Sequence, residues 1–431
     1  MEVMPGYKQT EVGVIPDDWT IETLGELGKW LSGGTPSMSE KTYWDGSIPW
    51  VSPKDMKVAR LHDASDHVSE KALTNGTRLA PQNALLMVVR GMILAHSFPV
   101  ARAERALAFN QDIKALVVRD SIDSDYLLWW LQAHKSALLS ITTESTHGTR
   151  RLPSETLFAQ KIALPSLSEQ KSIAEVLSNA DALIEILEQL IAKKRLLKKG
   201  VMQKLLTGRR RLRGFANATI GYKQTEVGVI PEDWAVTPMA ELFTFQNGVN
   251  ADKAAYGKGI PFINVLEVIT HSTLTETKIP GRISLSPQAS SAFRVQTGDL
   301  LFNRTSETQE EVGLASVYTD NREVVFGGFV IRARPRDGSL DPMFSSYALR
   351  SSAIRRQIVS RGQGAVRANI GQQELSKVQV FVPSLPEQEA IAAILSAMDA
   401  EIALLEAQLA KYRQLKQGMM QKLLTGRIRL V

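Results

Sequence analysis

Two polar segments flanked by glycine carry side chains that could recognise nucleic-acid bases. They read THGTRR at 146–151 and GQGAVRAN at 362–369. The arginine fork suits guanine, asparagine and glutamine suit adenine, and lysine or arginine on phosphates sets the register of a bound duplex. Polar, glycine-flanked loops are also the kind of element that enters a groove. The residue types therefore predict recognition of a polyanion by hydrogen bonding.

Further polar residues of the same types extend this set, and all of them are candidates for DNA contact. The candidates in the first half of the chain are Lys54, Arg78, Arg90, His96, Asn110, Gln111, Thr149, Arg150 and Arg151. Those in the second half are Asn264, Arg294, Asn303, Arg304, Arg322, Gln363, Arg367 and Asn369. Arg90 and Arg304 carry the most weight, because we expect them at matching places just after matching strands. A surface salt bridge is the alternative interpretation of both arginines.

Motifs for catalysis are missing from the sequence. GGTPSMSEKT at 33–42 has glycine, lysine and threonine in the order of a phosphate-binding loop, but its spacing is wrong and Pro36 interrupts it. GQG at 362–364 lacks the third glycine of a dinucleotide loop and is interpreted as a turn. The sequence contains no G-x-S-x-G, H-E-x-x-H or Asn/Asp-Pro-Pro-aromatic motif. PKDMK at 53–57 and SETLFAQK at 154–161 are interpreted as solvated surface, not as a nuclease site. We expect no catalytic residue, bound cofactor or metal in this chain.

The composition sets outer limits on fold and location. A chain of 431 residues is too long for one core, so we expect at least two domains. The 51 Lys+Arg against 45 Asp+Glu give a net charge of +6, which favours polyanionic partners. Cysteine is absent, which excludes disulfides and cysteine-ligated zinc. Without a long apolar run or a signal-peptide pattern, the sequence predicts a cytoplasmic protein with no membrane segment.

The chain contains an internal repeat. Residues 6–19 read GYKQTEVGVIPDDW and residues 221–234 read GYKQTEVGVIPEDW. A second match joins 164–212 with 382–430, where about three-fifths of the positions are identical. The two stretches of about 145 residues between these matches resemble each other only faintly. Two copies of one scaffold therefore carry two different surfaces.

The second matched segment has the pattern of a long helix in both copies. Apolar residues alternate steps of three and four, which is a heptad seam. The seam in the second copy is Ile391, Leu395, Met398, Ile402, Leu405, Leu409, Tyr412, Met419 and Leu423. In the first copy Lys194 and Lys198 interrupt it, within Ile173, Leu177, Ala180, Ile184, Leu187, Ile191, Lys194, Lys198, Val201 and Leu205. Ser168 and Pro386 mark the expected starts and the Thr-Gly pairs at 207–208 and 425–426 the ends, giving helices of about 40 residues, or roughly 60 Å.

The basic residues of these helices have several possible roles. KKRLLKK at 193–199 and Lys411, Arg413 and Lys416 could be solvated surface, or could face the phosphates of an unread spacer or an acidic partner. RRRLR at 209–213 joins the two halves and could contact DNA.

The variable stretches have a mixed helix and strand pattern. Strands are expected at 84–89, 113–118, 299–303 and 324–333, and helices at 126–140 and 343–360, with Trp129 and Trp130 in the core. The predicted fold class is α+β: two mixed α/β domains in a pseudo-two-fold repeat, separated by two long antiparallel coiled-coil helices. The expected domains are 1–160 and 214–378, with helical segments at 161–213 and 379–431.

With the repeat in view, the whole chain resembles the specificity subunits of type I restriction–modification enzymes. The residues that carry the resemblance are SGGTPS at 32–37, YW at 43–44, IPWVSPKDM at 48–56, LPSLSEQ at 164–170, LPEQ at 385–388, and QKLLTGR at 203–209 and 421–427. The second copy departs from this pattern, since it reads FQNGVNADK at 245–253 in place of SGGTPS. The resemblance therefore does not assign roles to the individual residues of that loop.

The resemblance implies a non-catalytic subunit that binds double-stranded DNA and reads a split, asymmetric target. It also implies partners, namely two adenine methyltransferase subunits docked on the helices and two ATP-driven restriction subunits. S-adenosylmethionine, ATP and Mg would then be bound by those partners and not by this chain. The alternatives are a coiled-coil interaction scaffold without DNA function, which the arginine-rich loops argue against, and a catalytic nuclease or methyltransferase, which the missing motifs argue against.

Overall fold

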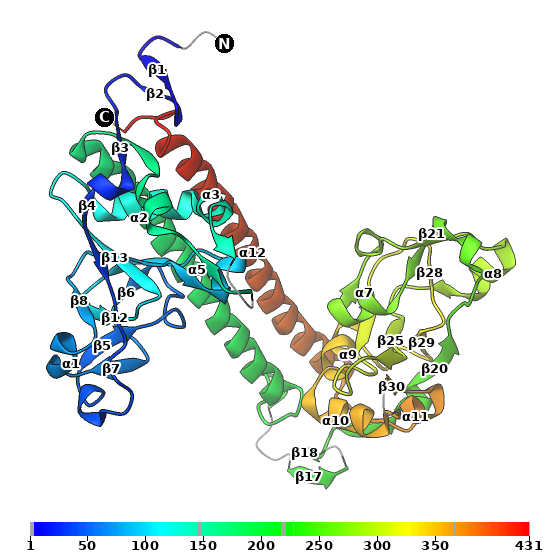
Figure 1. Cartoon of the computed structure of the whole chain (residues 1–431). Helices are drawn as coiled ribbons and strands as arrows, with labels where there is room; N and C mark the ends of the chain where they lie inside the picture. Colours follow the sequence, from blue (N-terminus) through cyan, green and yellow to red (C-terminus); the bar gives the residue numbers. More distant parts are fainter. Residues whose placement is uncertain (1–3, 145–147, 217–220, 227, 365–366, 431) are drawn as a thin grey trace. The chain divides into compact units, whose positions relative to one another are not determined.

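The structure is a computed structural model in which the chain forms two compact units (Figure 1). One unit combines residues 1–189 with 407–431, and the other contains residues 190–406. The domain boundaries expected from the sequence stay a prediction. The described residues are 4–144, 148–216, 221–226, 228–364 and 367–430.

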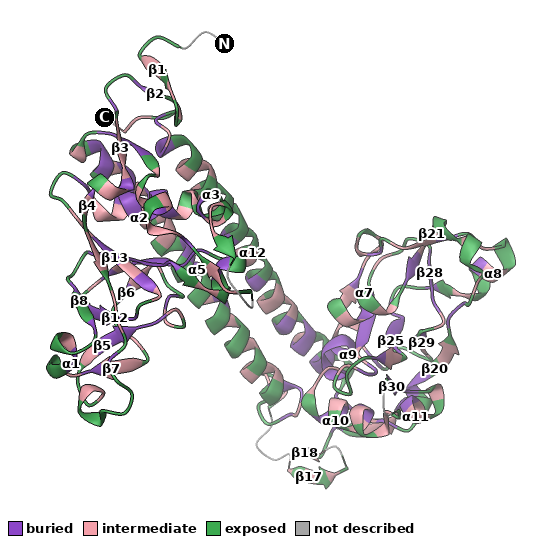
Figure 2. Ribbon diagram, in the orientation of Figure 1, coloured by how far each residue is buried: buried purple, intermediate pink, exposed green. Residues whose placement is uncertain are grey.

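Two sheets form the framework of the first unit. The larger has the order β4-β13-β9-β11-β6, with strands β4 (Gly28–Ser32), β13 (Ile113–Val118), β9 (Leu85–Val88), β11 (Val100–Ala103) and β6 (Arg60–Leu61). The other has the order β7-β5-β12-β8, with strands β7 (Asp66–Val68), β5 (Ile48–Val51), β12 (Leu107–Phe109) and β8 (Arg78–Ala80). β9 is buried along its whole length, so it anchors the segment that follows it. In the other sheet, most of β5 and all of β12 are buried as well (Figure 2).

Short elements complete this unit. They are the hairpin β1 (Tyr7–Thr10) and β2 (Gly13–Pro16), the pair β3 (Thr20–Thr23) and β16 (Lys161–Leu164), and the small sheet of β10 (Arg90–Gly91), β15 (Arg150–Arg151) and β14 (Thr143–Glu144). The short helices are α1 (Glu70–Thr74), α2 (Ser124–Ala133), α3 (Lys135–Ser140) and α4 (Ser154–Phe158). Trp129 and Trp130 on α2 are buried in the hydrophobic core, as predicted.

The second unit repeats this topology. Its larger sheet has the order β20-β29-β25-β27-β22, with strands β20 (Phe243–Asn247), β29 (Val330–Pro335), β25 (Leu300–Asn303), β27 (Ala315–Tyr318) and β22 (Thr273–Leu274). The other has the order β23-β21-β28-β24, with strands β23 (Arg282–Ile283), β21 (Tyr256–Ile263), β28 (Val324–Phe326) and β24 (Arg294–Val295). The two variable stretches therefore share one architecture despite their faint sequence similarity.

The strand pairs of the second unit also have counterparts in the first, whereas the second unit has two more short helices among the residues described. The strand pairs are β17 (Tyr222–Thr225) with β18 (Gly228–Pro231), β19 (Ala235–Pro238) with β31 (Gln379–Val382), and β26 (Thr305–Ser306) with β30 (Ala368–Asn369). The short helices are α6 (Met239–Leu242), α7 (Val265–Thr270), α8 (Pro287–Ala292), α9 (Pro342–Ala348), α10 (Ser352–Arg361) and α11 (Gln372–Ser376).

Three expected elements are divided in the structure. The segment expected as one strand at 324–333 forms β28 and β29, because Gly327 and Gly328 turn the chain between them. The expected helix at 126–140 is α2 followed by α3, and that at 343–360 is α9 followed by α10. The apolar pattern predicted the type of each element but not its interruption.

The two long helices are α5 (Leu167–Leu205) and α12 (Leu385–Leu423), each of 39 residues, close to the predicted length. Each begins one residue before the predicted start. Each ends just before the predicted Thr-Gly stop, where Gly208 and Gly426 have φ of +66° and +68°. Most seam residues are buried or half-buried in both helices. No helix of the described part of the chain is long and apolar enough to cross a membrane.

Ion pairs join the two helices within each unit. In the first unit Lys416 pairs with Asp181, and Arg413 with Glu188. In the second unit Lys198 pairs with Asp399, and Arg195 with Glu406. Residue numbers rise along one helix as they fall along the other, so the paired segments run antiparallel in each unit. These basic residues were candidates for contact with DNA phosphates, and in this structure they pair with carboxylates. Lys194 likewise pairs with Glu401.

In each unit, the tyrosine of the first repeated motif contacts the Thr-Gly end of a long helix, which belongs to the second repeated motif. The Tyr7 hydroxyl donates to the carbonyl of Gly426 at 3.0 Å, and Tyr222 donates to Gly208 at 3.1 Å. A Cβ on Gly426 would lie 2.4 Å from Cδ of Pro16, and Pro231 crowds Gly208 in the same way. Glycine is therefore required there both for the turn and for space.

Candidate nucleic-acid interface

In the first unit, three of the candidate residues lie on the small sheet that follows β9 along the chain. Arg90 in β10 lies directly opposite Arg151 in β15. The amide of Leu152 donates to the carbonyl of Val89 at 2.8 Å and holds the second strand in place. The segment expected as a polar loop thus forms a short strand, while Thr146 and His147 lie outside the described residues. Arg90, Arg150 and Arg151 are brought together by this pairing.

The Arg90 side chain contacts a carboxylate. Its Nε donates to Oδ1 of Asp112 at 2.7 Å, and the side chain of Arg90 is 51% exposed. Arg90 therefore forms a surface salt bridge in this structure, and its role in DNA contact stays a prediction. Asn110 lies behind the pair, since its Nδ2 donates to Asp112 Oδ2 at 3.2 Å. Asn110 is buried, so in this conformation it supports Asp112 and does not present its amide to a base.

The other first-unit candidates have varied settings. Arg78 is exposed on β8 opposite Phe109, close to the turn that carries the exposed Gln111. Gln111 accepts a hydrogen bond from Thr35. Lys54 lies after β5 and pairs with Asp66 at 2.7 Å. His96 is exposed after a 3-10 helix, Met92–Ala95, and Thr149 is half-buried directly before β15.

Lys114 is a neighbour of this cluster that the sequence analysis missed. It lies on β13, and its Nζ donates to Ser32 Oγ at 3.1 Å. Burial lowers the pKa of the Lys114 ammonium, and the positive charge of Arg151 lowers it further. Lys114 therefore adds a further basic residue to Arg90, Arg150 and Arg151, and its ammonium lies close enough to Arg151 for the two charges to repel. A lysine inside an apolar strand pattern gives no sequence signal of such a neighbourhood.

The second unit forms the same small sheet with different side chains. Thr305 in β26 lies opposite Asn369 in β30. Gln363 and Asn369 exchange backbone hydrogen bonds of 2.8 and 2.7 Å. The Asn369 side chain donates to the carbonyl of Arg367 at 2.9 Å. Arg304, Gln363, Arg367 and Asn369 are all exposed here, while Ala365 and Val366 of the same segment lie outside the described residues.

The prediction that Arg90 and Arg304 occupy matching places is wrong by one residue. Leu152 donates to Val89 in the first unit, and Ile370 donates to Arg304 at 2.9 Å in the second. Val89 is therefore the counterpart of Arg304, and Arg90 is the counterpart of Thr305. In an extended segment a shift of one residue turns the side chain to the opposite face.

The same comparison places Phe329 at the position of Asp112. The amide of Val89 donates to the carbonyl of Asp112, and that of Arg304 donates to Phe329, both at 2.8 Å. Phe329 is 65% exposed, which is unusual for a phenyl ring. Phe329 was not among the candidates because its segment, 324–333, was expected to be one continuous strand.

Asn303 has a structural role. It is 0% exposed, and its Nδ2 donates to the carbonyls of Thr305 and Glu311 at 3.2 and 3.0 Å. Its Oδ1 accepts from the Leu314 amide. Both the nitrogen and the oxygen of this side-chain amide are hydrogen-bonded inside the fold, so Asn303 does not present a base-reading group in this conformation.

The other second-unit candidates are exposed and lie apart from this sheet along the chain. Asn264 precedes α7, where its backbone N–H donates to the Glu267 side chain in a capping box. Arg294 is on β24, and Arg322 follows the turn at Asp320. A role of any candidate in DNA contact stays a prediction.

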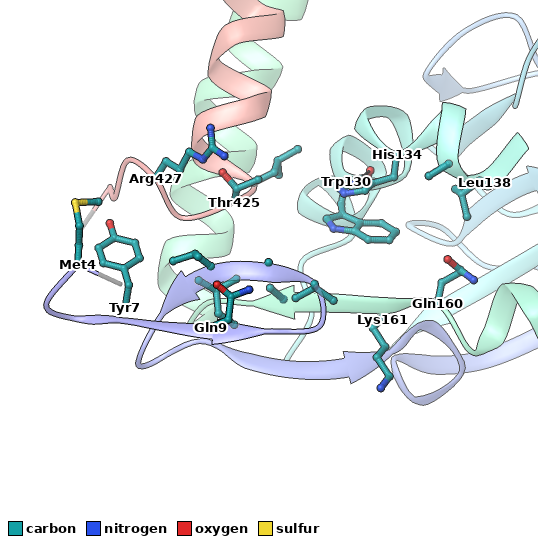
Figure 3. Close-up of a pocket in the computed structure, with 17 residues that line it drawn as sticks. Met4, Tyr7, Gln9, Trp130, His134, Leu138, Gln160, Lys161, Thr425 and Arg427 are labelled. Carbon is teal, nitrogen blue, oxygen red and sulfur yellow. Dashed lines mark hydrogen bonds between the residues drawn. The ribbon is translucent and has the colours of Figure 1, made fainter. Parts of the chain in front are cut away.

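A separate cavity of about 650 Å³ lies in the first unit between the N-terminal hairpin, α2, α3 and the residues after α12 (Figure 3). Its walls include Tyr7, Leu138 and Thr425. The His134 ring stacks on Trp130 with centroids 4.0 Å apart, and burial lowers the pKa of His134. None of the candidate DNA-contact residues lines this cavity.

Comparison with a family model identifies two matching regions. The type I restriction modification DNA specificity domain matches residues 16–193 and 231–412. Among curated proteins, the EcoR124I/EcoR124II specificity subunit of Escherichia coli is 36% identical over 179 residues, covering 41% of this chain and 43% of that subunit. The MjaVIII specificity subunit of Methanocaldococcus jannaschii is 24% identical and covers 96% of this chain and 94% of the relative.

Solved structures show the same fold over nearly the whole chain. The S subunit of a type I restriction-modification system from M. genitalium has a TM-score of 0.58 at 14% identity and covers 98% of both chains. A chain from structural work on complex assembly and conformational transition of the type I R-M system has a TM-score of 0.54 at 14% identity. It covers 96% of this chain and 99% of its own.

Proposed function

The chain belongs to the type I restriction modification DNA specificity family, and from this premise we propose that each of its two domains reads one half of a split, asymmetric target. The observation that carries this proposal is one scaffold with different exposed chemistry. Arg90, Asp112 and Arg151 in the first unit correspond to Thr305, Phe329 and Asn369 in the second. Two such surfaces suit two different half-sites.

Within each domain we assign two kinds of contact. The small sheets, with Arg90 in the first domain and Arg304 and Asn369 in the second, present groups that suit base edges. Exposed cations around them, such as Arg78 and Arg367, suit phosphates and set the register on the duplex. Phosphate contacts of this kind make binding strongly dependent on salt.

The long helices set the distance between the half-sites in this proposal. They would pair as an antiparallel coiled coil along their length and hold the domains apart. The buried seam residues and the cross-helix ion pairs of each unit support this arrangement.

Catalysis is assigned to partner subunits. Two methyltransferase subunits would dock on the helices, and two restriction subunits would complete the enzyme. Large apolar side chains remain exposed at equivalent helical positions, Ile186 with Leu404 and Leu197 with Leu415, and such residues suit a protein partner. S-adenosylmethionine, ATP and Mg would be bound by those partners.

The test is a methylation assay with purified components. The chain alone should neither methylate nor cut DNA. Adding the cognate methyltransferase should produce methylation at one split site, and the methyltransferase alone should not. Methylation or cleavage by the chain alone would overturn the proposal.

A further inference from the structure

Asp112 contacts both Arg90 and Asn110 of the first-unit cluster, through its backbone and through its side chain. Its carbonyl accepts from the amides of Val89 at 2.8 Å and Arg90 at 3.3 Å. Its Oδ1 accepts from Nε of Arg90, and its Oδ2 accepts from the buried Asn110. The amide of Asp112 in turn donates to Oδ1 of Asn110 at 3.1 Å. Asn110 thus holds the Asp112 carboxylate through Oδ2, while Oδ1 accepts from Arg90.

This contact leaves the outer edge of the Arg90 guanidinium available. Only Nε is bonded to Asp112, and no other side-chain hydrogen bond of Arg90 occurs among the residues described. The two terminal nitrogens together form the fork that matches O6 and N7 of guanine. A guanidinium whose orientation is set by a carboxylate loses less freedom on binding than a free arginine.

The charges around Arg90 favour a ligand rich in acceptors. Arg90 and Arg151 are directly opposite on paired strands, so their side chains leave the same face, where like charges repel. Asp112 neutralises one of them, with an Nε to Oδ1 distance of 2.7 Å. An acceptor-bearing base edge beside a phosphate would relieve the remaining repulsion.

We propose that Asp112 is a positioning residue that holds Arg90 for bidentate recognition of one guanine, with Arg151 on a neighbouring phosphate. This inference rests on the proposed function. It applies to the first domain alone, because the second has Phe329 and Thr305 at the corresponding positions. The second domain reads its half-site with other groups.

The experiment uses the complex of the full chain with its methyltransferase and a pool of duplexes with randomised positions. Sequencing the bound fraction gives the preference for each base at each position. The wild-type complex should select a split motif with at least one guanine in the first half-site. Asp112→Asn should lower the preference for that guanine about tenfold and leave the other half-site unchanged. Arg90→Ala should affect the same position, and the double variant should be no worse than Arg90→Ala alone.

Two further variants separate positioning from folding and general charge. Arg90→Lys keeps the charge but loses the fork, so it should lose the same guanine preference while binding non-specific duplex as before. Glu22→Gln is the matched control: Glu22 binds Arg119 at 2.6 Å at the opposite end of β13, and the variant should select the wild-type motif.

Several outcomes would overturn the inference. They are a wild-type motif without guanine in the affected half-site, an unchanged motif in Asp112→Asn or Arg90→Lys, and an equal loss of binding to every sequence. A wild-type complex that selects no sequence would instead reject the proposed function itself.

Discussion

Arg429 and Glu169 form a doubly hydrogen-bonded ion pair, in which Nε lies 2.6 Å from Oε1 and Nη2 lies 2.8 Å from Oε2. Glu169 is 0% exposed in the first turn of α5, and it also accepts from the indole of Trp19. Arg211 and Glu387 repeat this pair in the second unit. The hydrogen bonds with Glu169 and Asp18 raise the pKa of Arg429 above its ordinary value.

Removing Arg429 should therefore destabilise the first unit. Arg429→Ala leaves the buried carboxylate of Glu169 without its cation, and the expected loss is about 3 kcal/mol of unfolding free energy. Urea denaturation followed by tryptophan fluorescence measures this loss. Arg427→Ala, at an exposed neighbouring position, should change the stability little. Equal effects of the two variants would show that the ion pair contributes nothing particular.

Lys416 should couple the helices to the first domain. Its ammonium lies 4.1 Å from the centroid of the Trp129 ring and pairs with Asp181. Lys416→Met should cost about 1–2 kcal/mol, because it removes a cation–π contact and leaves the carboxylate unpaired. A double-mutant cycle with Trp129→Leu measures the coupling, and Lys411→Met on the same helix is the control. A coupling energy of zero would contradict this role.

Arg304 should contribute to the second half-site only. If its fork binds guanine, Arg304→Ala should cost about 1–3 kcal/mol and relax the preference at one position. Competition binding with duplexes that differ at single positions measures both quantities. An equal loss for all sequences, with a weaker salt dependence, would reassign Arg304 to a phosphate.

Lengthening both helices should lengthen the unread spacer. Seven residues inserted after Ala192 and seven after Ala410 keep the heptad register and add roughly 10 Å, close to three base pairs. Methylation mapping should then find the same half-sites with a longer spacer, and an insertion in one helix alone should abolish activity. Added base pairs also rotate one half-site about the duplex axis, so several insert lengths are needed. A spacer that stays at its original length would reject the ruler.

The repeat and the long helices could be predicted because their signals are local. A heptad seam, a Thr-Gly stop and two copies of one motif are visible without tertiary contacts, and the helices begin within one residue of expectation. The family resemblance was also visible in the repeated motifs. It favours DNA recognition over a coiled-coil scaffold, and the matching specificity domain supports this choice.

The geometry of the candidate site could not be predicted, because strand pairing joins residues far apart in the sequence. The small sheets consist of strands of two residues, such as β10 and β15, whose partners lie about 60 residues away. Their register decided that Val89 and not Arg90 corresponds to Arg304. Burial of Asn303 depends on the fold of the following loop, because its partners Glu311 and Leu314 lie there, and the apolar pattern does not specify that fold.

The most direct test of the account is to map methylated adenines in DNA from cells that contain the methyltransferase with either the wild-type chain or a chimera. In the chimera, residues of about 20–155 are replaced by the corresponding segment of a family member with another target. Independent reading by two domains predicts a split target for the wild type, and a chimera target with one half-site replaced and the other half-site and spacer retained. A chimera that remains active but changes both half-sites, or neither, would contradict independent reading by two domains.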